Sequence, residues 1–324
     1  MPSVFHYTDT AGAVGILTSQ SLFASDLRYL NDASEGTIID SLLMPVLLEE
    51  VAMASRELVA AGFVTKRYYE ELGSNADQLQ AEALFRSLAT ATNNISPRFA
   101  VSFCRHDEGS EPFEHGLLSQ WRGYADRGGV ALEFDESKLS DLIDEESKKY
   151  FYGPIVRGDV LYRDFEEMFK KEDYEGLARA MIGQVFLDTK VTKLHEFAKR
   201  KKIKEIAGKK NIDETVAKYL STAPFLKHFG FHEEREHRLA IACVREGKIP
   251  EGAQSPAKPV EFRVRNNLIV PFVRLFGDWA KLPIKSVIVG PHPNQVLQQD
   301  AIERLLEQKD ISARVRLSLI PFRG

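Results

Sequence analysis

The stretch Phe99-Ala-Val-Ser-Phe-Cys104 decides the fold of this 324-residue chain, because a short and nearly continuous apolar run is typical of a buried β-strand. Ser96-Pro97 stands just before it and marks the start of a new element. Two further runs of the same character lie downstream, at Val130–Phe134 after the Gly128-Gly129 pair and at Arg238–Val244. Together these runs predict a sheet in the interior of the protein.

The rest of the chain supplies more strands and several amphipathic helices. Strands are predicted at Val4–Thr8, Ser21–Ser25, Gly153–Tyr162, Val260–Val264, Ser286–Val289 and Arg314–Ile320. Apolar residues recur three and four positions apart, or lie at helical spacing, in Ala11–Ser19, Thr37–Ala61, Asp77–Thr92, Leu117–Ala125 and Gln295–Gln308. In the last of these we expect packing on the sheet by Val296, Leu297, Ile302, Leu305 and Leu306. The pattern predicts an α+β fold, with a mixed or mainly antiparallel central sheet flanked by helices.

The chain is expected to form a single α+β domain over residues 1–324. Residues 164–228 are charged and rich in helix-forming residues, and we expect them to form a helical insertion or lid within that domain. Residues 252–259 are predicted to be a loop and not a linker between domains.

Composition excludes several classes of protein. Hydrophobic residues make up 44% of the chain and charged residues 28%, as in ordinary globular proteins. The net charge of −4 argues against a protein that simply coats nucleic acid. A local exception is the basic run Lys199–Lys210, which is either a solvated helix end or a salt-sensitive contact to the phosphates of a nucleic acid.

The cysteines and the hydropathy pattern bear on location. Cys104 and Cys243 both lie in apolar, strand-like runs, where a free thiol behaves as a small core residue. The first residues lack the pattern of a signal peptide, and no apolar stretch reaches the roughly 18 residues of a membrane span. We therefore expect a cytoplasmic protein without a membrane partner.

Common catalytic motifs are missing from the sequence. It contains no phosphate-binding P-loop, no dinucleotide-binding glycine motif, no Gly-x-Ser-x-Gly elbow and no His-Glu-x-x-His zinc helix. His228 and His232 are four residues apart, but no Glu follows His228 and no third ligand accompanies them. No metal site is therefore predicted.

Short polar and aromatic clusters stand where strands meet turns. They are His6-Tyr7-Thr8, Asn31-Asp32-Ala33-Ser34-Glu35, Ser102-Phe103-Cys104, Gln120–Tyr124, Gly129–Phe134, Glu233–Leu239 and Ile288-Val289-Gly290-Pro291. Their order and residue types resemble the bacterial family known as domain of unknown function 2971 over nearly the whole chain. Two features depart from that pattern: Ala33-Ser34 widens the spacing before Glu35, and His237 stands where an aromatic residue is frequent.

The layout of these clusters is also similar to that of ADP-ribosyltransferases that use NAD. This likeness implies an enzyme that takes NAD as its donor, with a role as a toxin or as a phage-defence effector. Breaking the nicotinamide–ribose bond gives the sugar oxocarbenium character, which a carboxylate on a late strand can stabilise. Glu236 is the first candidate for that carboxylate and Glu234 the second. Both are expected on one face of a strand, because strand side chains alternate, and Arg238 is expected to follow them on that face.

The likeness assigns roles to the other clusters as well. His6 is expected to donate to a ribose hydroxyl, Trp121 or Tyr124 to stack on a planar ring, and Arg238 to hold a phosphate or carboxylate. The residues expected to bind the NAD-like nucleotide are Tyr7, Thr8, Asn31, Asp32, Glu35, Trp121, Tyr124 and Arg238.

Other interpretations of the same residues stay open. His6 can be a core histidine, Asp32 and Glu35 a helix-capping pair, and Trp121 with Tyr124 the packing face of a helix. One alternative function is hydrolysis of a nucleotide or glycosidic bond, with Glu234 and Glu236 as acid and base. Another is a non-catalytic module that binds a nucleotide or a partner.

Overall fold

The structure is a computed structural model that describes residues 2–30, 38–60, 62, 65–71, 73–124, 128–177, 212–265, 267–277 and 279–321. The chain divides into two compact units. The first contains Met1–Ala33, Arg98–Arg163 and Lys227–Gly324, and the second contains Ser34–Pro97 and Asp164–Leu226. The second unit draws on two segments of the chain. Residues 178–211 of the expected insertion at 164–228 lie outside the described chain, so this insertion stays a prediction.

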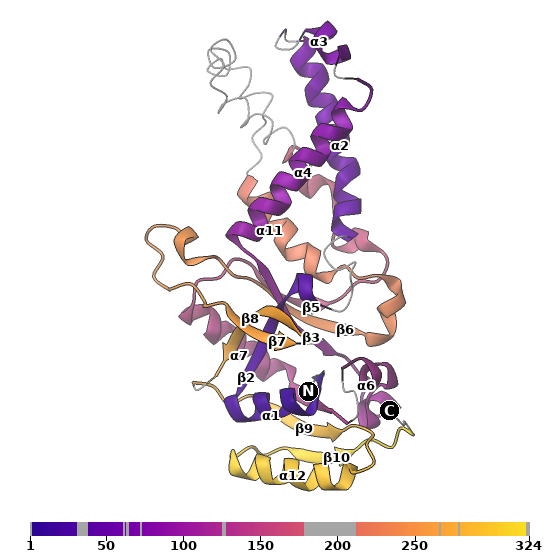
Figure 1. The fold of residues 1–324 in the computed structure, drawn as a ribbon, viewed down its shortest axis with the longest axis vertical. Helices are drawn as coiled ribbons and strands as arrows, with labels where there is room; N and C mark the ends of the chain where they lie inside the picture. Colours follow the sequence, from indigo (N-terminus) through magenta and orange to yellow (C-terminus); the bar gives the residue numbers. More distant parts are fainter. Residues whose placement is uncertain are drawn as a thin grey trace. The chain divides into compact units, whose positions relative to one another are not determined.

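The first unit is built on one ten-stranded sheet (Figure 1). Its strands are β1 Ser3–Thr8, β2 Ser21–Asp26, β3 Arg98–Cys104, β4 Val130–Asp135, β5 Ile155–Asp159, β6 Glu236–Ala242, β7 Glu261–Arg265, β8 Leu268–Phe276, β9 Ile284–Val289 and β10 Arg314–Leu317. The main path runs β10-β9-β4-β1-β3-β2-β8-β7, and β6 joins β3 to β5. The pair β9–β10 is parallel and the other described pairs are antiparallel, which confirms the predicted α+β fold with a mainly antiparallel sheet.

The sheet forks at β3. Strand β6 pairs with β3 along its whole length, from Arg98 to Cys104. The opposite edge of β3 is shared, because β2 pairs with Phe99 and Ala100 while β1 pairs with Cys104. The strands β1 and β2 therefore leave the same edge of β3 at its two ends.

The main apolar core lies on one face of this sheet and is covered by three helices. They are α1 Thr10–Ser19, α7 Glu136–Lys149 and α12 Gln295–Gln308, and each contributes buried side chains to the core. In α12 the inward residues are Ile302 and Leu306, with Leu305 partly buried beside them. The expected packing of Val296 and Leu297 is wrong, since these first-turn residues are 68% and 69% exposed.

A smaller apolar cluster lies on the other face of the sheet. It contains Phe5, Tyr7, Cys104, Trp121, Ala131 and Ile288. Two short helices, α5 Glu111–His115 and α6 Leu118–Tyr124, follow β3 and supply Phe113, Trp121 and Tyr124 to this cluster.

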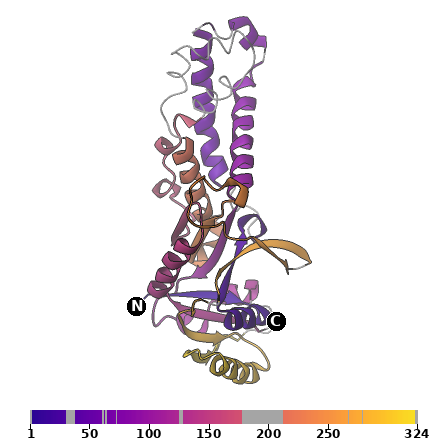
Figure 2. The same cartoon turned by 90° about the vertical axis from the view of Figure 1, so that its left-hand side faces the viewer.

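The second unit is helical in its described part. Its helices are α2 Ile38–Ala60, α3 Lys66–Glu71, α4 Ala76–Ile95 and α11 Ile212–Thr222. The long helices α2 and α4 pack side by side, and α11 packs against α4 (Figures 1 and 2). Glu50 of α2 accepts a hydrogen bond from the backbone N–H of Gly176 at 2.9 Å, which joins the two segments of this unit.

Local sequence explains the elements that flank the candidate site. Asp135 ends β4 and begins α7, because its carboxylate accepts hydrogen bonds from the N–H groups of Ser137 and Lys138. Asp9 begins α1 in the same way, with a bond from the N–H of Gly12 at 2.6 Å. Gly12 is required there, since a Cβ atom at this position would lie 2.1 Å from Thr8 Oγ1.

Candidate functional site

Strand β6 carries Glu236 and Arg238 into the interior of the sheet. On β3, Cys104 lies opposite Glu236 and Ser102 lies opposite Arg238. The side chains of Glu236 and Arg238 are only 2% and 1% exposed. They point to the same face, as predicted from the alternation of strand side chains.

These two residues belong to a buried cluster of four charges, which we call the glutamate-pair cluster: Lys227, Glu234, Glu236 and Arg238. Lys227 Nζ donates to Glu234 Oε2 at 2.8 Å and to Glu236 Oε2 at 2.9 Å. Arg238 holds the other oxygen of Glu236, with Nε and Nη2 at 2.8 and 2.6 Å from Oε1. Two carboxylates thus face two cations, a balance that buried ions require.

Glu234 reaches this cluster through a turn that the sequence pattern does not predict. It ends a 3₁₀ helix, η5 Phe229–Glu234, and Arg235 follows with a left-handed backbone at φ 42°. Strand β6 begins only at Glu236. The expectation that Glu234 and Glu236 share one strand face is therefore wrong, and the turn at Arg235 brings Glu234 to Lys227 instead.

The two glutamates differ in exposure and in the direction of their pKa shifts. Burial raises the pKa of Glu234, although Lys227 partly offsets that effect, and its side chain is 14% exposed. Burial alone would also raise the pKa of Glu236. The positive charges of Arg238 and Lys227 outweigh the effect of burial, so the pKa of Glu236 lies below its ordinary value. The cluster therefore holds one firmly ionised carboxylate in the interior and one that takes up a proton more readily at its margin.

Cys104 lies beside the glutamates but is unsuited to act as a nucleophile. Burial, followed by the charges of Glu236 and Glu234, raises the pKa of its thiol well above the usual value. Nucleophilic and metal-binding cysteines act as thiolates, so this neutral, buried thiol is a packing residue.

Tyr7 lies on the same face of the sheet as the glutamates, within the smaller apolar cluster. Its hydroxyl accepts a hydrogen bond from the N–H of Leu117 at 2.9 Å and donates to Nε2 of His106 at 2.8 Å. Burial lowers the pKa of His106 to about 4, so the ring is neutral and accepts this bond. Trp121 packs edge-on against Tyr7 with ring centroids 4.9 Å apart.

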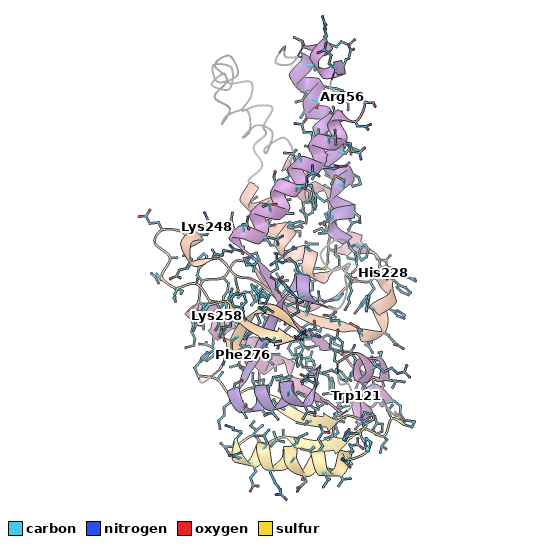
Figure 3. The ribbon with its side chains drawn as sticks, in the orientation of Figure 1. Arg56, Trp121, His228, Lys248, Lys258 and Phe276 are labelled. Atoms are coloured by element: carbon cyan, nitrogen blue, oxygen red, sulfur yellow. The ribbon has the colours of Figure 1, made fainter. Side chains whose placement is uncertain are left out.

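Trp121 is an interior residue of α6 (Figure 3). It is 1% exposed, and its indole N–H donates to the carbonyl of His115 at 3.1 Å. Gly116 and Gly290 lie so close to the ring that a Cβ atom at either position would come within 3.0 Å of it. Of the two residues expected to stack on a ligand ring, Trp121 is buried and packs α6 onto the sheet. Stacking by the alternative, Tyr124, stays a prediction.

Helix α6 also connects the aromatic motif with the glutamates. It packs against η5, the segment that ends in Glu234. Tyr124 ends α6 and is partly buried against the smaller apolar cluster. The structure thus brings together, on one face, the predicted residues Tyr7, Trp121, Tyr124, Glu234, Glu236 and Arg238.

His6 and Thr8 lie on the opposite face. Their partners on β4 are Leu132 and Val130, which belong to the main core, whereas Tyr7 pairs with Ala131 of the smaller cluster. His6 Nδ1 donates a hydrogen bond to the carbonyl oxygen of Ser102 at 2.9 Å, at the strand where the sheet forks. Burial lowers the pKa of His6, so the neutral ring is favoured. The expected grouping of His6 and Thr8 with the glutamates is therefore wrong.

Asn31, Asp32 and Glu35, and the basic run Lys199–Lys210, lie outside the described residues. Within the described part of the chain, no group of three potential ligands could hold a metal ion.

The structure adds two polar residues that no sequence motif marks. Lys227 joins the two glutamates, and Tyr162 accepts a hydrogen bond from the N–H of Glu236 at 2.9 Å. Neither belongs to a conspicuous motif, so only the proximity of Lys227 to the Glu-rich segment could have suggested it.

A second polar group lies where β5 ends and β6 begins. Arg105 donates to both oxygens of Glu136 at 2.8 and 2.5 Å and to Asp159 at 2.7 Å. His237 Nδ1 is 2.6 Å from Asp159, and the hydrogen bond from His237 lowers the pKa of Asp159 to about 2. These contacts tie the end of β5 to the start of β6 and α7.

Comparison with known proteins identifies one region of similarity. Residues 120–239 match the model of the family described as Protein of unknown function (DUF2971). No curated protein and no solved structure matched the chain. None of the described helices is long and apolar enough to cross a membrane. The matching segment runs from Gln120 in α6 to Leu239 in β6, so the chain is similar to this family over the part that contains α6, η5 and the glutamate-pair cluster.

Proposed function

We propose that this chain is an enzyme that breaks the N-glycosidic bond of NAD or an NAD-like nucleotide and transfers the ADP-ribosyl group to an acceptor. The observation that supports the proposal most is the pair of glutamates joined by Lys227, with pKa values shifted in opposite directions. Neighbouring carboxylates whose environments separate their pKa values are characteristic of acid–base sites.

Glu234 and Glu236 have different roles in this proposal, because they differ in exposure. Glu234, at the margin of the cluster, is the carboxylate that meets the ligand. Glu236 is a positioning residue, because its buried carboxylate holds Lys227 and Arg238 in place. This order reverses the assignment made from the sequence, in which Glu236 came first.

The reaction balances with these residues. The bond between C1′ of the ribose and the nicotinamide nitrogen breaks, and its electron pair leaves with nicotinamide, whose positive charge is thereby neutralised. An acceptor oxygen or nitrogen bonds to C1′, and its proton passes to Glu234 acting as general base. A base with a raised pKa holds that proton better than an ordinary glutamate does.

Hydrolysis is the second candidate reaction, with water as the acceptor. The raised pKa of Glu234 favours it, since the same carboxylate can take the proton of an attacking water while Glu236 keeps its positioning role. Transfer and hydrolysis share the first bond cleavage and differ only in what attacks C1′.

The acceptor for transfer is a nucleic acid, a protein or a small molecule. The basic run Lys199–Lys210 favours a nucleic acid, through contacts to phosphates. Replacing its lysines by glutamine should flatten the salt dependence of nucleic-acid binding, and an unchanged slope would exclude that contact. Consumption of NAD would also provide the chemical basis for the toxin or phage-defence role that we propose.

The test uses purified full-length chain, NAD labelled on the adenylate half, and total cell extract. Nicotinamide release and label transfer are measured for the wild type, Glu234→Gln and Glu236→Gln, with Glu146→Gln as a control at a buried glutamate of α7. Label transfer that is lost in Glu234→Gln and kept in Glu146→Gln supports ADP-ribosyl transfer. Nicotinamide release without label transfer supports hydrolysis. NAD binding without turnover supports a non-catalytic module, and neither binding nor turnover overturns the proposal.

A further inference from the structure

The edge of the sheet formed by β7 carries exposed apolar side chains. Strand β7 ends the main path of the sheet and pairs with β8 alone among the described strands. Phe262, Val264 and Ile269 in this hairpin are 67%, 75% and 65% exposed, and Val260 just before it is 37% exposed. In Figure 2 the hairpin is the orange pair of strands that extends from the rest of its unit. An exposed apolar edge of this kind is a template for pairing with another strand.

The hairpin geometry shows which backbone groups face the open edge. Only residues 266 and 267 separate Arg265 from Leu268, the last pair of the ladder. In a two-residue hairpin that last pair exchanges both backbone hydrogen bonds, and every second pair does so. Glu261, Arg263 and Arg265 therefore bond to β8, while the N–H and C=O groups of Phe262 and Val264 point outward.

The sequence of this edge is complementary to itself. In Val260-Glu-Phe-Arg-Val264, antiparallel pairing with a second copy about Phe262 places Val260 opposite Val264 and Phe262 opposite itself. The same register places Glu261 opposite Arg263 twice. Apolar side chains meet on one face and opposite charges on the other, and both kinds of cross-strand pair stabilise a sheet. The outward backbone groups of Phe262 and Val264 also receive partners in this register.

Arg263 supplies an independent observation. Its Nε is buried and has no hydrogen-bond partner within the described chain. Its Nη2 donates to Ser25 Oγ at 2.9 Å, and its guanidinium lies 5.5 Å from the ring centroid of Phe23. Glu261 is held by Arg274 of its own chain at 3.1 and 2.7 Å. In the proposed pairing the Glu261 carboxylate of a second copy lies opposite Arg263 and is shared between these two arginines.

We propose that two copies of this chain associate through antiparallel pairing of their β7 strands, with the twofold axis at Phe262. The sheets of the two copies then form one continuous sheet. The register is specific, because moving the axis by one residue, to Arg263, sets two guanidinium groups opposite each other.

A cysteine pair tests the register directly. In a hydrogen-bonded antiparallel pair the two Cα atoms are about 5.5 Å apart, within the range that a disulfide spans. Phe262→Cys should therefore form a disulfide between copies under mild oxidation. Val264→Cys is the matched control, since its two copies would be offset by four residues, about 13 Å. The native cysteines, Cys104 and Cys243, are both buried and do not compete. Equal cross-linking of the two variants, or none in either, overturns the proposed register.

The mass in solution tests the association itself. Sedimentation analysis of the full chain should give twice the chain mass of 36.6 kDa, and Phe262→Lys should halve that value by placing two ammonium groups at the axis. Leu297→Lys, at a residue of α12 that is 69% exposed, should leave the dimer intact. A wild-type chain that remains at 36.6 kDa at every concentration, or a dimer that survives Phe262→Lys, contradicts the proposal.

Discussion

Two buried groups of charges in the first unit invite comparison, the glutamate-pair cluster and the ion pair between Glu146 and Lys258. Glu146 Oε1 accepts from Lys258 Nζ at 2.6 Å and from Tyr152 Oη at 2.8 Å, while Oε2 faces the N–H of Phe276 at 3.3 Å. The side chains of Glu146 and Lys258 are 2% and 7% exposed. One carboxylate is thus matched by one cation and fully enclosed (Figure 3 labels Lys258 and Phe276).

The difference between the two groups lies in how their charges are shared. Both are buried and balanced, so burial alone does not mark a functional site. In the glutamate-pair cluster one ammonium serves two carboxylates, and one of these, Glu234, reaches the margin with a raised pKa. The Glu146 pair joins α7 to the segment before β7. We infer that Glu146 stabilises the fold, whereas Glu234 is the residue to which we propose a chemical role.

The largest expected effect comes from breaking the enclosed pair. Lys258→Met leaves the Glu146 carboxylate buried without its cation, which should lower the free energy of unfolding by about 3–5 kcal/mol. Urea unfolding followed by circular dichroism measures this change. Lys281→Met is the matched control, because its pair with Asp310 is exposed and solvent screens it, so only a small loss is expected there. Equal losses in the two variants would contradict the structural role of Lys258.

The next effect concerns acid stability at the smaller apolar cluster. The folded-state pKa of His106 is about 4, against 6.5 for the free side chain, so the unfolded chain binds the proton first as pH falls. Stability should therefore decrease between pH 6.5 and 4, by about 3 kcal/mol in total from this residue. His106→Gln keeps an acceptor for the Tyr7 hydroxyl but cannot titrate. The difference in unfolding free energy between the wild type and this variant should shrink as pH falls, and a constant difference would refute the assignment.

A smaller effect distinguishes the two glutamates within their cluster. A double-mutant cycle of Lys227→Met with Glu236→Gln should give a coupling energy of about 2 kcal/mol, typical of a charged and buried hydrogen bond. The same cycle with Glu234→Gln should give about 1 kcal/mol, since that side chain is partly exposed and solvent screens it. Chemical denaturation of the six proteins gives both values. A stronger coupling to Glu234 would reverse the roles that we assign.

The smallest effect is expected at the polar group at the end of β5. The pKa of Asp159 is lowered to about 2 by its bonds to His237 and Arg105, so its contribution is present above pH 3.8 and is lost as pH falls toward 2. Its side chain is 63% exposed, so solvent reduces that contribution to about 0.5 kcal/mol. Asp159→Asn should therefore shift the thermal midpoint at neutral pH only slightly. A large shift would show that this group, and not the glutamate-pair cluster, fixes the start of β6.

Much of the sheet could be predicted from the sequence, because buried strands carry short apolar runs. The alternation rule also placed Glu236 and Arg238 on one face correctly. Among the elements that escaped prediction, α7 and β8 did so for local reasons. Helix α7 has few apolar residues among its charges, and β8 contains Pro271, which is unusual inside a strand. Pro271 is tolerated because the pairing of β8 with β2 begins only at Phe272.

The candidate site was harder to predict, because it depends on turns and long-range topology. The left-handed backbone of Arg235 carries Glu234 off the strand, and no periodicity signals such a turn at a residue other than glycine. The position of His6 follows from the fork at β3, where strands distant in sequence share one edge. Sequence patterns show which residues alternate, but they do not show which strands become neighbours.

The most direct test of the central claim is the rate of nicotinamide release from NAD by the wild type and by Glu234→Gln, at equal NAD occupancy measured by calorimetry. We predict that Glu234→Gln binds NAD but releases nicotinamide about 100-fold more slowly, as expected for loss of an acid–base group. An unchanged rate in Glu234→Gln, or no release of nicotinamide by the wild type, would contradict the account.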